Sequence, residues 1–400
     1  LMASQIVRYL CIIGSLLLLL AQGEGLCVST APDHKQFVRI AVIDDAQQLE
    51  VLIRGKYKIM DPLTADVLTE GRTLPRSQIN PLKGGIQIGS HQFAQTWIRL
   101  VPPKEAILRY QDNDLRYRGH MDVLLKKNGK LLVINVLELE QYVKGVLYHE
   151  VSDRWPMEAM KAQAVAARTY AIDQIQKNKN ERFDMRGDIY SQVYGGKKAE
   201  RFRTNIAVDR TRGQILFSEG KILPAYYHSS CGGHTEDVRN LWKDNVNALR
   251  GVPCDFCRLG PHYTWRRNYR LKDIQDKLNA VGYHLGLIQE IRVLDRNESG
   301  RIKNLQITTR DGNSVLIPGR KFRDIIGPNL IKSNNYEAVM KGYYFDLTGK
   351  GWGHGVGMCQ WGANQMSRQR FTYHDILQFY YPGSEIVDDR QEANHSNAFE

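Results

Sequence analysis

The sequence predicts an α+β fold, in which a β-rich N-terminal region over residues 36–115 precedes a mixed helical and β domain over residues 116–387. An inserted α/β lobe is expected at about residues 269–335, with a cleft between the lobes. Three observations support this prediction. The 400 residues exceed the usual length of one domain, short β-branched segments come first, and helical periodicity follows them.

Strand-like segments follow one another from Phe37 to about Val136. They are short, rich in β-branched residues and separated by Gly, Pro, Asn and Asp, which is typical of strands joined by turns. The segments read "FVRIAVI", "LEVLIRG", "GIQIG", "WIRLV", "AILRY" and "LLVINV". We therefore expect this part of the chain to be mostly β.

Two helices are expected next, over residues 137–149 and from residue 157 to about 177. Pro156 fits the first helical position of the second helix, where its fixed φ and missing N–H are tolerated. The inserted lobe reads as helix, strand, strand and helix, and the turn sequences "NESG" and "DGN" lie between its strands.

The two ends of the chain have their own signals. Arg8 precedes the apolar run "YLCIIGSLLLLLAQGEG", and Ala21 with Gly23 offers a small-x-small cleavage site. Residues 1–25 are therefore predicted to be a signal peptide, and the protein to be exported. An uncleaved membrane anchor is the alternative, although the run is short for spanning a bilayer. The polar residues 388–400 are expected to form a disordered tail.

The charge favours an anionic partner. Lys and Arg number 55 against 43 Asp and Glu, a net charge of +12. Nucleic acid, lipid headgroups and acidic polysaccharide are the possible partners of so basic a protein. Nucleic acid ranks last, because the chain has neither a basic block interleaved with aromatics nor the signature of a nucleic-acid module.

One carboxylate stands out in the first predicted helix. Leu139, Val143, Val146 and Glu150 lie four, three and four residues apart, the spacing of one buried helical stripe. Burial makes an ionised carboxylate costly and raises its pKa, which produces a general acid near neutral pH. The alternative is an ordinary Glu at a frayed helix end, turned to solvent or to Arg154.

Cysteine and histidine pairs suggest a metal site. Without Cys11, which the signal segment contains, the chain has an odd number of cysteines, so at least one is free, intermolecular or bound to metal. The predicted zinc ligands are Cys231, His234, Cys254 and Cys257, paired as C-x2-H and C-x2-C. His228 and His262 are alternative fourth ligands. A reversible disulfide between Cys254 and Cys257 competes with a closed, structural zinc site.

A glycine-rich segment, "GWGHGVGMCQWGA", forms the third candidate. Its glycines let the backbone approach a ligand closely, and His354 and Gln360 place polar groups before the following helix. The spacing differs from that of a phosphate-binding loop, so phosphate binding is not expected.

Four segments in order resemble the signatures of the stage II sporulation protein D family (SpoIID/LytB), whose members act on bacterial peptidoglycan. They are "LELEQYVKGVLYHEVSDRWPMEAMKAQAVAARTYA", "SQVYGG", "AYYHSSCGGHTEDV" and "GKGWGHGVGMCQWGANQMSRQ", and the similarity spans roughly residues 117–385. The resemblance implies a lytic transglycosylase of the cell envelope that cuts glycan strands lacking stem peptides. Its catalytic glutamate coincides with Glu150.

The implied chemistry needs one carboxylate. Glu150 would protonate the bridging oxygen after N-acetylmuramic acid and then deprotonate the C6 hydroxyl of that sugar as it attacks the anomeric carbon, giving a 1,6-anhydro end. A typical glycosidase uses two carboxylates, and Glu138, Glu140 and Glu158 lie off the stripe of Glu150. Denuded glycan exposes lactyl carboxylates, which agrees with the basic charge.

The resemblance also implies which residues line the cleft and hold metal. The predicted substrate-binding residues are Gln163, Arg168, Tyr170, Gln192, Tyr194, Tyr227, Ser229, Ser230, His354 and Gln360. Some family members are thought to bind zinc near the position of Cys231. Cys359 stands where members usually carry a small residue such as Ser, so its role is left open.

A second function from a different class is compatible with the sequence. The LytB branch of the family suggests a non-catalytic glycan-binding module that enhances a partner amidase. Glu150 favours the enzyme, because a binding module has no need of a buried acid.

Overall fold

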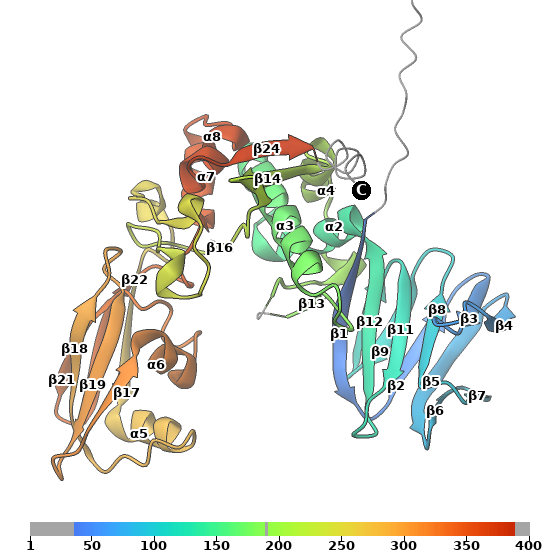
Figure 1. The fold of residues 1–400 in the computed structure, drawn as a ribbon, viewed down its shortest axis with the longest axis horizontal. Coiled ribbons are helices and arrows are strands. Elements are labelled where there is room, and N and C mark those ends of the chain that lie inside the picture. Colours follow the sequence, from blue (N-terminus) through green and yellow to red (C-terminus); the bar gives the residue numbers. More distant parts are fainter. Residues whose placement is uncertain (1–35, 189–190, 389–400) are drawn as a thin grey trace, which may run out of the picture. The chain divides into compact units, whose positions relative to one another are not determined.

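The computed structural model describes residues 36–188 and 191–388 and confirms the predicted α+β class (Figure 1). The predicted signal peptide and nearly all of the predicted tail lie outside the described residues. Within the described ranges, no helix is long and apolar enough to cross a lipid bilayer.

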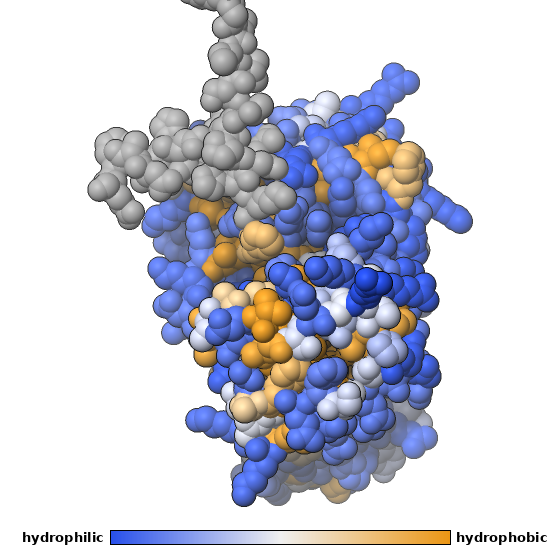
Figure 2. All heavy atoms as spheres, turned by 90° about the vertical axis from the view of Figure 1, so that its right-hand side faces the viewer, coloured by the Kyte–Doolittle hydropathy of each residue, from blue (hydrophilic) through white to orange (hydrophobic). Residues whose placement is uncertain are grey.

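Two antiparallel sheets, with one short parallel edge strand, form the N-terminal part of the chain. The seven-stranded sheet has the order β13-β1-β12-β11-β8-β3-β4 and the six-stranded sheet the order β10-β9-β2-β5-β6-β7. Their strands are β1 (Phe37–Ala46), β2 (Leu49–Ile53), β3 (Tyr57–Met60), β4 (Val67–Gly71), β5 (Leu74–Leu82), β6 (Gly85–Ile88), β7 (His91–Phe93), β8 (Trp97–Val101), β9 (Ala106–Tyr110), β10 (Asn113–Tyr117), β11 (His120–Leu125), β12 (Leu131–Glu138) and β13 (Met185–Arg186). The surface in this region is mostly hydrophilic, with apolar side chains in smaller groups (Figure 2).

Strand β12 leads directly into the first described helix, α2 (Leu139–Glu150). This helix begins two residues later than predicted, because β12 pairs with β1 as far as Glu138. Val143 and Val146 of α2 belong to the same hydrophobic cluster as Ile40 of β1. Since a fully buried Val or Ile side chain contributes about 1.5–3 kcal/mol, this packing holds the end of α2 in place.

The longest helix, α3, lies at the centre of the helical layer. Apart from α2, the helices outside residues 264–350 are α3 (Met157–Lys177), α4 (Phe202–Arg210), α7 (Gln360–Arg368), α8 (Tyr373–Tyr380) and the 3-10 turns η1 (Gly196–Ala199), η2 (Val238–Asn240), η3 (Asn247–Leu249) and η4 (Phe256–Leu259). Helix α3 begins at Met157 as predicted, but Pro156 is the N-cap residue and not the first helical residue. Its buried Ala164, Ala167 and Ala171 allow α2, α4, α7 and α8 to approach closely.

Two small sheets connect distant parts of the sequence. The sheet β15-β14-β24 is built from β14 (Gln214–Ser218), β15 (Lys221–Ile222) and β24 (Glu385–Asp388), and β16 (Tyr227–His228) pairs in parallel with β23 (Met358–Cys359). In the second pair Tyr227 lies opposite Met358 and His228 opposite Cys359. This pairing brings the "AYYHSSCGG" segment beside the glycine-rich segment.

Residues 264–350, which we call the insert lobe, form two three-stranded sheets and two helices. These are β17 (Thr264–Arg270), α5 (Leu271–Asn279), β18 (Ile288–Arg296), β19 (Ile302–Thr309), β20 (Ser314–Pro318), α6 (Gly319–Ile326), β21 (Tyr336–Lys341) and β22 (Tyr344–Lys350). The lobe has its own hydrophobic cluster, which contains Leu305, Phe322 and Phe345. Strands β17 and β22 pair from Thr264↔Lys350 onward, so the lobe begins and ends at one place.

Candidate functional site

A pocket of about 370 Å³ lies where α2 ends and β16 meets the glycine-rich segment. Its described lining residues are Glu150, Tyr170, Ser191, Gln192, Val193, Tyr226, Tyr227, His228, Ser229, Trp242, Trp352, Gly353, His354 and Gln360. Among them Glu150 is the only carboxylate. The pocket therefore offers a single acidic group surrounded by amides, hydroxyls and aromatic rings.

Glu150 is the last residue of α2, and its carboxylate is held by hydrogen-bond donors. The amide Nε2 of Gln360 donates to Oε2 of Glu150 at 3.2 Å, and the Val193 amide and Tyr227 hydroxyl also donate to the carboxylate. Burial outweighs these bonds and raises the pKa of Glu150 to about 7. The carboxylate points into the pocket, and no ion pair with Arg154 is found among the described residues.

A chain of buried hydrogen bonds supports the Tyr227 hydroxyl. Gln192 donates from Nε2 to the Tyr227 oxygen at 2.8 Å, and Tyr142 donates its hydroxyl to Gln192 Oε1 at 2.8 Å. Burial raises the pKa of Tyr227 well above its usual value, so the phenol stays protonated and remains a donor for Glu150. Tyr142 lies in α2, Tyr227 lies in β16, and Gln192 lies in the loop between β13 and η1. Together these three residues orient the carboxyl group of Glu150.

The opposite part of the pocket holds two neutral histidines. Burial lowers the pKa of His354 to about 3, and burial likewise lowers the pKa of His228 well below its usual range. The two rings lie 5.6 Å apart, and His354 also meets Trp242 edge-on at 5.3 Å. Neither ring is an imidazolium near neutral pH, so neither acts as a strong general acid, and Glu150 is the better general acid of this pocket.

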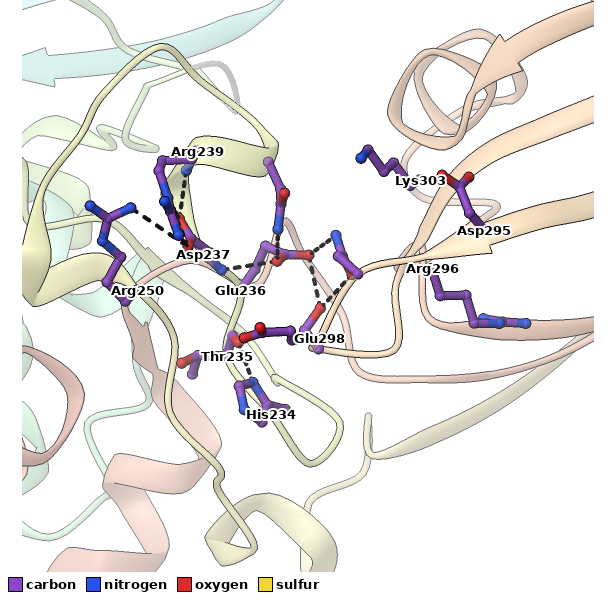
Figure 3. Close-up of a pocket in the computed structure, with 13 residues that line it drawn as sticks. His234, Thr235, Glu236, Asp237, Arg239, Arg250, Asp295, Arg296, Glu298 and Lys303 are labelled. Atoms are coloured by element: carbon purple, nitrogen blue, oxygen red, sulfur yellow. Dashed lines mark hydrogen bonds and ion pairs between the residues drawn. The ribbon is translucent and has the colours of Figure 1, made fainter.

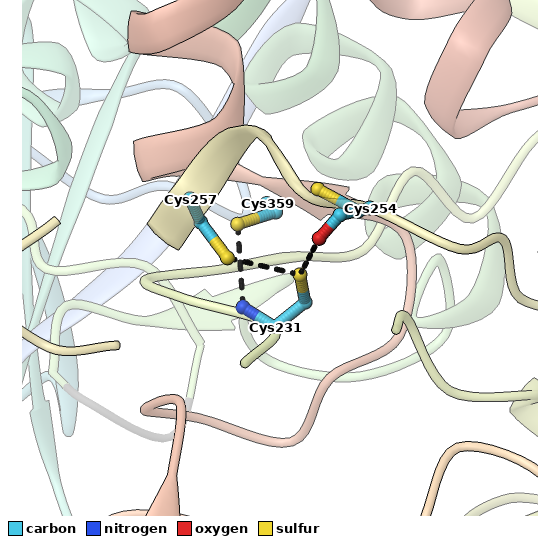
Figure 4. A group of neighbouring side chains, drawn as sticks. All are labelled: Cys231, Cys254, Cys257 and Cys359. Atoms are coloured by element: carbon cyan, nitrogen blue, oxygen red, sulfur yellow. Dashed lines mark hydrogen bonds between the residues drawn. The ribbon is translucent and has the colours of Figure 1, made fainter. Parts of the chain in front are cut away.

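Four buried cysteine thiols form a second cluster (Figure 4). The sulfur atoms of Cys231, Cys254, Cys257 and Cys359 lie within 4.8 Å of one another, and none of the four is disulfide-bonded. The thiols interact with each other, and the contact with Cys231 lowers the pKa of Cys257. Such a compact group of thiols matches the four-sulfur donor set that zinc or an iron–sulfur centre takes.

The cluster corrects one of the predicted ligands. Cys359 occupies the fourth position, and His234 lies outside the cluster, with its Nδ1 2.6 Å from the Thr235 carbonyl oxygen. His228 lies outside the cluster as well, with its Nδ1 3.1 Å from the Val356 carbonyl oxygen. The sulfur of Cys359 also accepts a hydrogen bond from Gly362 N at 3.3 Å and thereby caps α7. Gln360, the donor to Glu150, is the first residue of that helix.

Comparison with known proteins agrees with this geometry. The family model for the stage II sporulation protein matches residues 127–217, which contain α2 and α3. The stage II sporulation protein D of Bacillus amyloliquefaciens is 30% identical over 268 residues, covering 63% of this chain and 75% of the relative. The chain belongs to the stage II sporulation protein D family. This membership supports a role at the bacterial cell wall.

Other relatives of this SpoIID-family chain add detail. An uncharacterized protein of Brachyspira hyodysenteriae is 39% identical over 279 residues, covering 69% of this chain and 73% of the relative. A Bacillus subtilis protein named amidase enhancer is 27% identical over 295 residues, covering 61% of this chain and 40% of the relative. Residues 256–357, which include the whole insert lobe, match a family model described as a domain of unknown function, DUF8618.

The structure separates the predicted substrate residues into two groups. Those that line the pocket are Tyr170, Gln192, Tyr227, Ser229, His354 and Gln360. Gln163, Arg168, Tyr194 and Ser230 do not line it. Gln163 lies behind the pocket, where its Oε1 accepts a hydrogen bond from Gln360 at 3.4 Å, and Ser230 is fully buried.

Arg168 and Tyr194 have structural partners instead. The buried Arg168 guanidinium pairs with Glu140 at 2.6 Å, and the Tyr194 hydroxyl donates to Asn135 at 2.8 Å. Both residues share SpoIID motifs with true pocket residues, but their side chains point into the core. The position of a residue within a motif does not reveal which way its side chain points.

Tyr226, Trp242 and Trp352 were not among the predicted substrate-binding residues. All three line the pocket, and the rings of Tyr226 and Trp242 stack at 4.4 Å. The sequence signal for Trp352 was its place within "GWGHG", two residues before His354.

A buried polar contact joins the insert lobe to the segment that carries Cys231 (Figure 3). Glu236 accepts hydrogen bonds from Asn240, Asn297 and Ser299, and Arg301 donates to the carbonyl oxygen of Cys231 at 2.8 Å. A pocket of about 300 Å³ beside this contact is lined by acidic and basic side chains in equal number. Because the carboxylate of Glu236 is satisfied by protein donors, this contact serves to attach the lobe.

Proposed function

We propose that this chain is a peptidoglycan lytic transglycosylase that cleaves denuded glycan strands at N-acetylmuramic acid, with Glu150 as the sole acid and base. The observation that carries the proposal is the carboxylate of Glu150 in a pocket with no second carboxylate among its described lining residues. A pKa of about 7 suits a group that first gives up a proton and then takes one back.

The reaction needs both protonation states in turn. Protonated Glu150 donates its proton to the bridging oxygen as the bond from that oxygen to the anomeric carbon breaks. The carboxylate then takes the proton of the C6 hydroxyl, whose oxygen forms the new bond to the anomeric carbon. The products are a 1,6-anhydro sugar and a free hydroxyl on the departing strand, and no water is consumed. Gln360 and Tyr227 keep the carboxyl oriented throughout.

Product analysis tests this proposal. Purified protein is incubated with denuded glycan strands and, separately, with strands that keep their stem peptides. The products are then identified by mass spectrometry. Strands ending in 1,6-anhydro-N-acetylmuramic acid are expected from the denuded substrate. Reducing ends would indicate hydrolysis by water and contradict the proposed mechanism.

A non-catalytic module that enhances a cell-wall amidase is the second candidate. The relative named amidase enhancer favours it, and glycan binding in the same pocket is compatible with it. The distinguishing result is a protein that binds glycan, cleaves none of it, and raises the rate of a cell-wall amidase. In either case the chain acts at the cell envelope, and residues 1–25 are proposed to direct its export or to anchor it.

We also propose that Cys231, Cys254, Cys257 and Cys359 hold one structural zinc ion. Four thiols leave no open position for water, so the ion would organise loops rather than take part in the reaction. Metal analysis should find about one zinc per chain in the wild type and a large loss in Cys359→Ser. Serine still caps helices, so the loss would reflect the missing ligand. His234→Ala is the matched control and should retain the metal.

A further inference from the structure

Two tryptophans line the pocket of Glu150, and the insert lobe places a cation over each ring. The guanidinium of Arg320 lies 5.4 Å from the ring centre of Trp242, and the ammonium of Lys332 lies 4.6 Å from the ring centre of Trp352. The insert lobe, which matches a domain of unknown function, therefore contributes positive charge at the pocket.

The two cations differ in their partners. Arg320 lies 3.8 Å from Asp324 and donates to the carbonyl oxygen of Leu241, so its charge and its donors are already engaged. Lys332 is only partly buried, and within residues 36–188 and 191–388 no carboxylate lies at ion-pair distance from it. Its charged neighbour is another cation, Arg267. An ammonium in such surroundings attracts an anion from outside the chain.

The backbone of Lys332 is fixed to the wall of the pocket. Gly353 donates its N–H to the Lys332 carbonyl oxygen at 2.9 Å, and Gly353 and Trp352 line the same pocket as Glu150. Lys332 does not itself line the pocket, but its ammonium lies over the ring of Trp352, which does. A glycan strand that enters the pocket past Trp352 would therefore come near this positive charge.

We propose that Lys332 binds the lactyl carboxylate of a muramic acid residue that passes Trp352 on its way into the pocket, and so selects glycan strands without stem peptides. In a denuded strand the lactyl group ends in a carboxylate, whereas in a peptide-bearing strand the same carbon is part of a neutral amide. A lysine with no carboxylate partner distinguishes the two by charge. This inference rests on the glycan substrate of the proposed function and assigns its selectivity to the insert lobe.

Binding measurements with the catalytically inactive Glu150→Gln variant test this inference. Glu150→Gln protein, alone or with Lys332→Gln, Lys332→Arg or Lys341→Gln, is titrated with denuded glycan and with the same glycan after reduction of its lactyl carboxylates to alcohols. Lys341 is the matched control, because it loses the same charge but is paired with Asp346 at 3.1 Å on β21. Lys332→Gln should lose about two- to fivefold in affinity for the carboxylate form only. Lys332→Arg should retain the preference.

The inference would be overturned by equal weakening for both glycans in Lys332→Gln, by an unchanged preference for the carboxylate form, or by the same loss in Lys341→Gln. Absence of binding to either glycan would overturn it too. The test is independent of catalysis. If wild-type protein fails to cut glycan but Lys332→Gln loses the carboxylate preference, the enzyme proposal falls and the selectivity proposal stands.

Discussion

Helix α2 carries a carboxylate near each end, and the two have opposite surroundings. At its start, Glu140 receives two hydrogen bonds from the Arg168 guanidinium, at 2.6 and 2.8 Å. At its end, Glu150 receives bonds from neutral donors only, and burial raises its pKa to about 7. A buried carboxylate with a guanidinium partner stabilises the fold, while one without a cation becomes a proton donor. Because both residues belong to one helix, the difference between them comes from the partner of each carboxylate.

The largest expected effect is the loss of turnover when Glu150 is replaced. Glu150→Gln keeps the shape of the side chain but has no transferable proton, so turnover of denuded glycan should fall by about a hundredfold to ten-thousandfold. Glycan binding should be retained, and the midpoint of urea unfolding below pH 4.5, where Glu150 is protonated in both states, should match that of the wild type. Undiminished turnover in Glu150→Gln would show that another residue is the general acid.

Glu140→Gln removes the ion pair between Glu140 and Arg168 at the start of α2. It leaves the Arg168 guanidinium, which is completely buried, without its counter-charge and should cost about 3–5 kcal/mol of unfolding free energy in urea. Turnover per folded molecule should change little. The matched control is Glu50→Gln at a more exposed ion pair with Arg76, where less than about 1 kcal/mol is expected. Equal losses in the two variants would show that the buried pair is not special.

The raised pKa of Glu150 should also make the unfolding free energy depend on pH. Burial raises the pKa of Glu150 from 4.5 to about 7, so the folded protein holds a proton that the unfolded chain releases. This contribution is complete below pH 4.5 and is lost as the pH rises through 7, by up to roughly 3 kcal/mol. The unfolding free energy of wild type minus that of Glu150→Gln should fall over this range. A flat difference would mean that Glu150 has an ordinary pKa.

The smallest effect comes from a neighbour of Glu150. Gln360→Met removes the amide that donates to the carboxylate at 3.2 Å, a bond that lowers the pKa of Glu150. The pH profile of turnover should move upward by up to about one pH unit, since one such bond is worth about 1 kcal/mol. A lower maximum rate with an unmoved profile would assign Gln360 to substrate positioning instead.

Local patterns in the sequence predicted much of this site. The spacing of Leu139, Val143, Val146 and Glu150 singled out the acid, and Pro156 marked the start of α3. The "NESG" and "DGN" turns correctly joined the strands of the insert lobe. These signals act over a few residues, so one sequence is enough to read them.

The sequence by itself determined that Glu150 shares the stripe of a buried helix face, because helical periodicity is a local property of the chain. Only the tertiary structure decided which groups surround each side chain. The parallel pairing of β16 with β23 made Cys359 the fourth thiol in place of His234 and brought Gln360 to Glu150. Partners so far apart in the sequence meet through strand pairing and packing. No spacing rule along the chain specifies them.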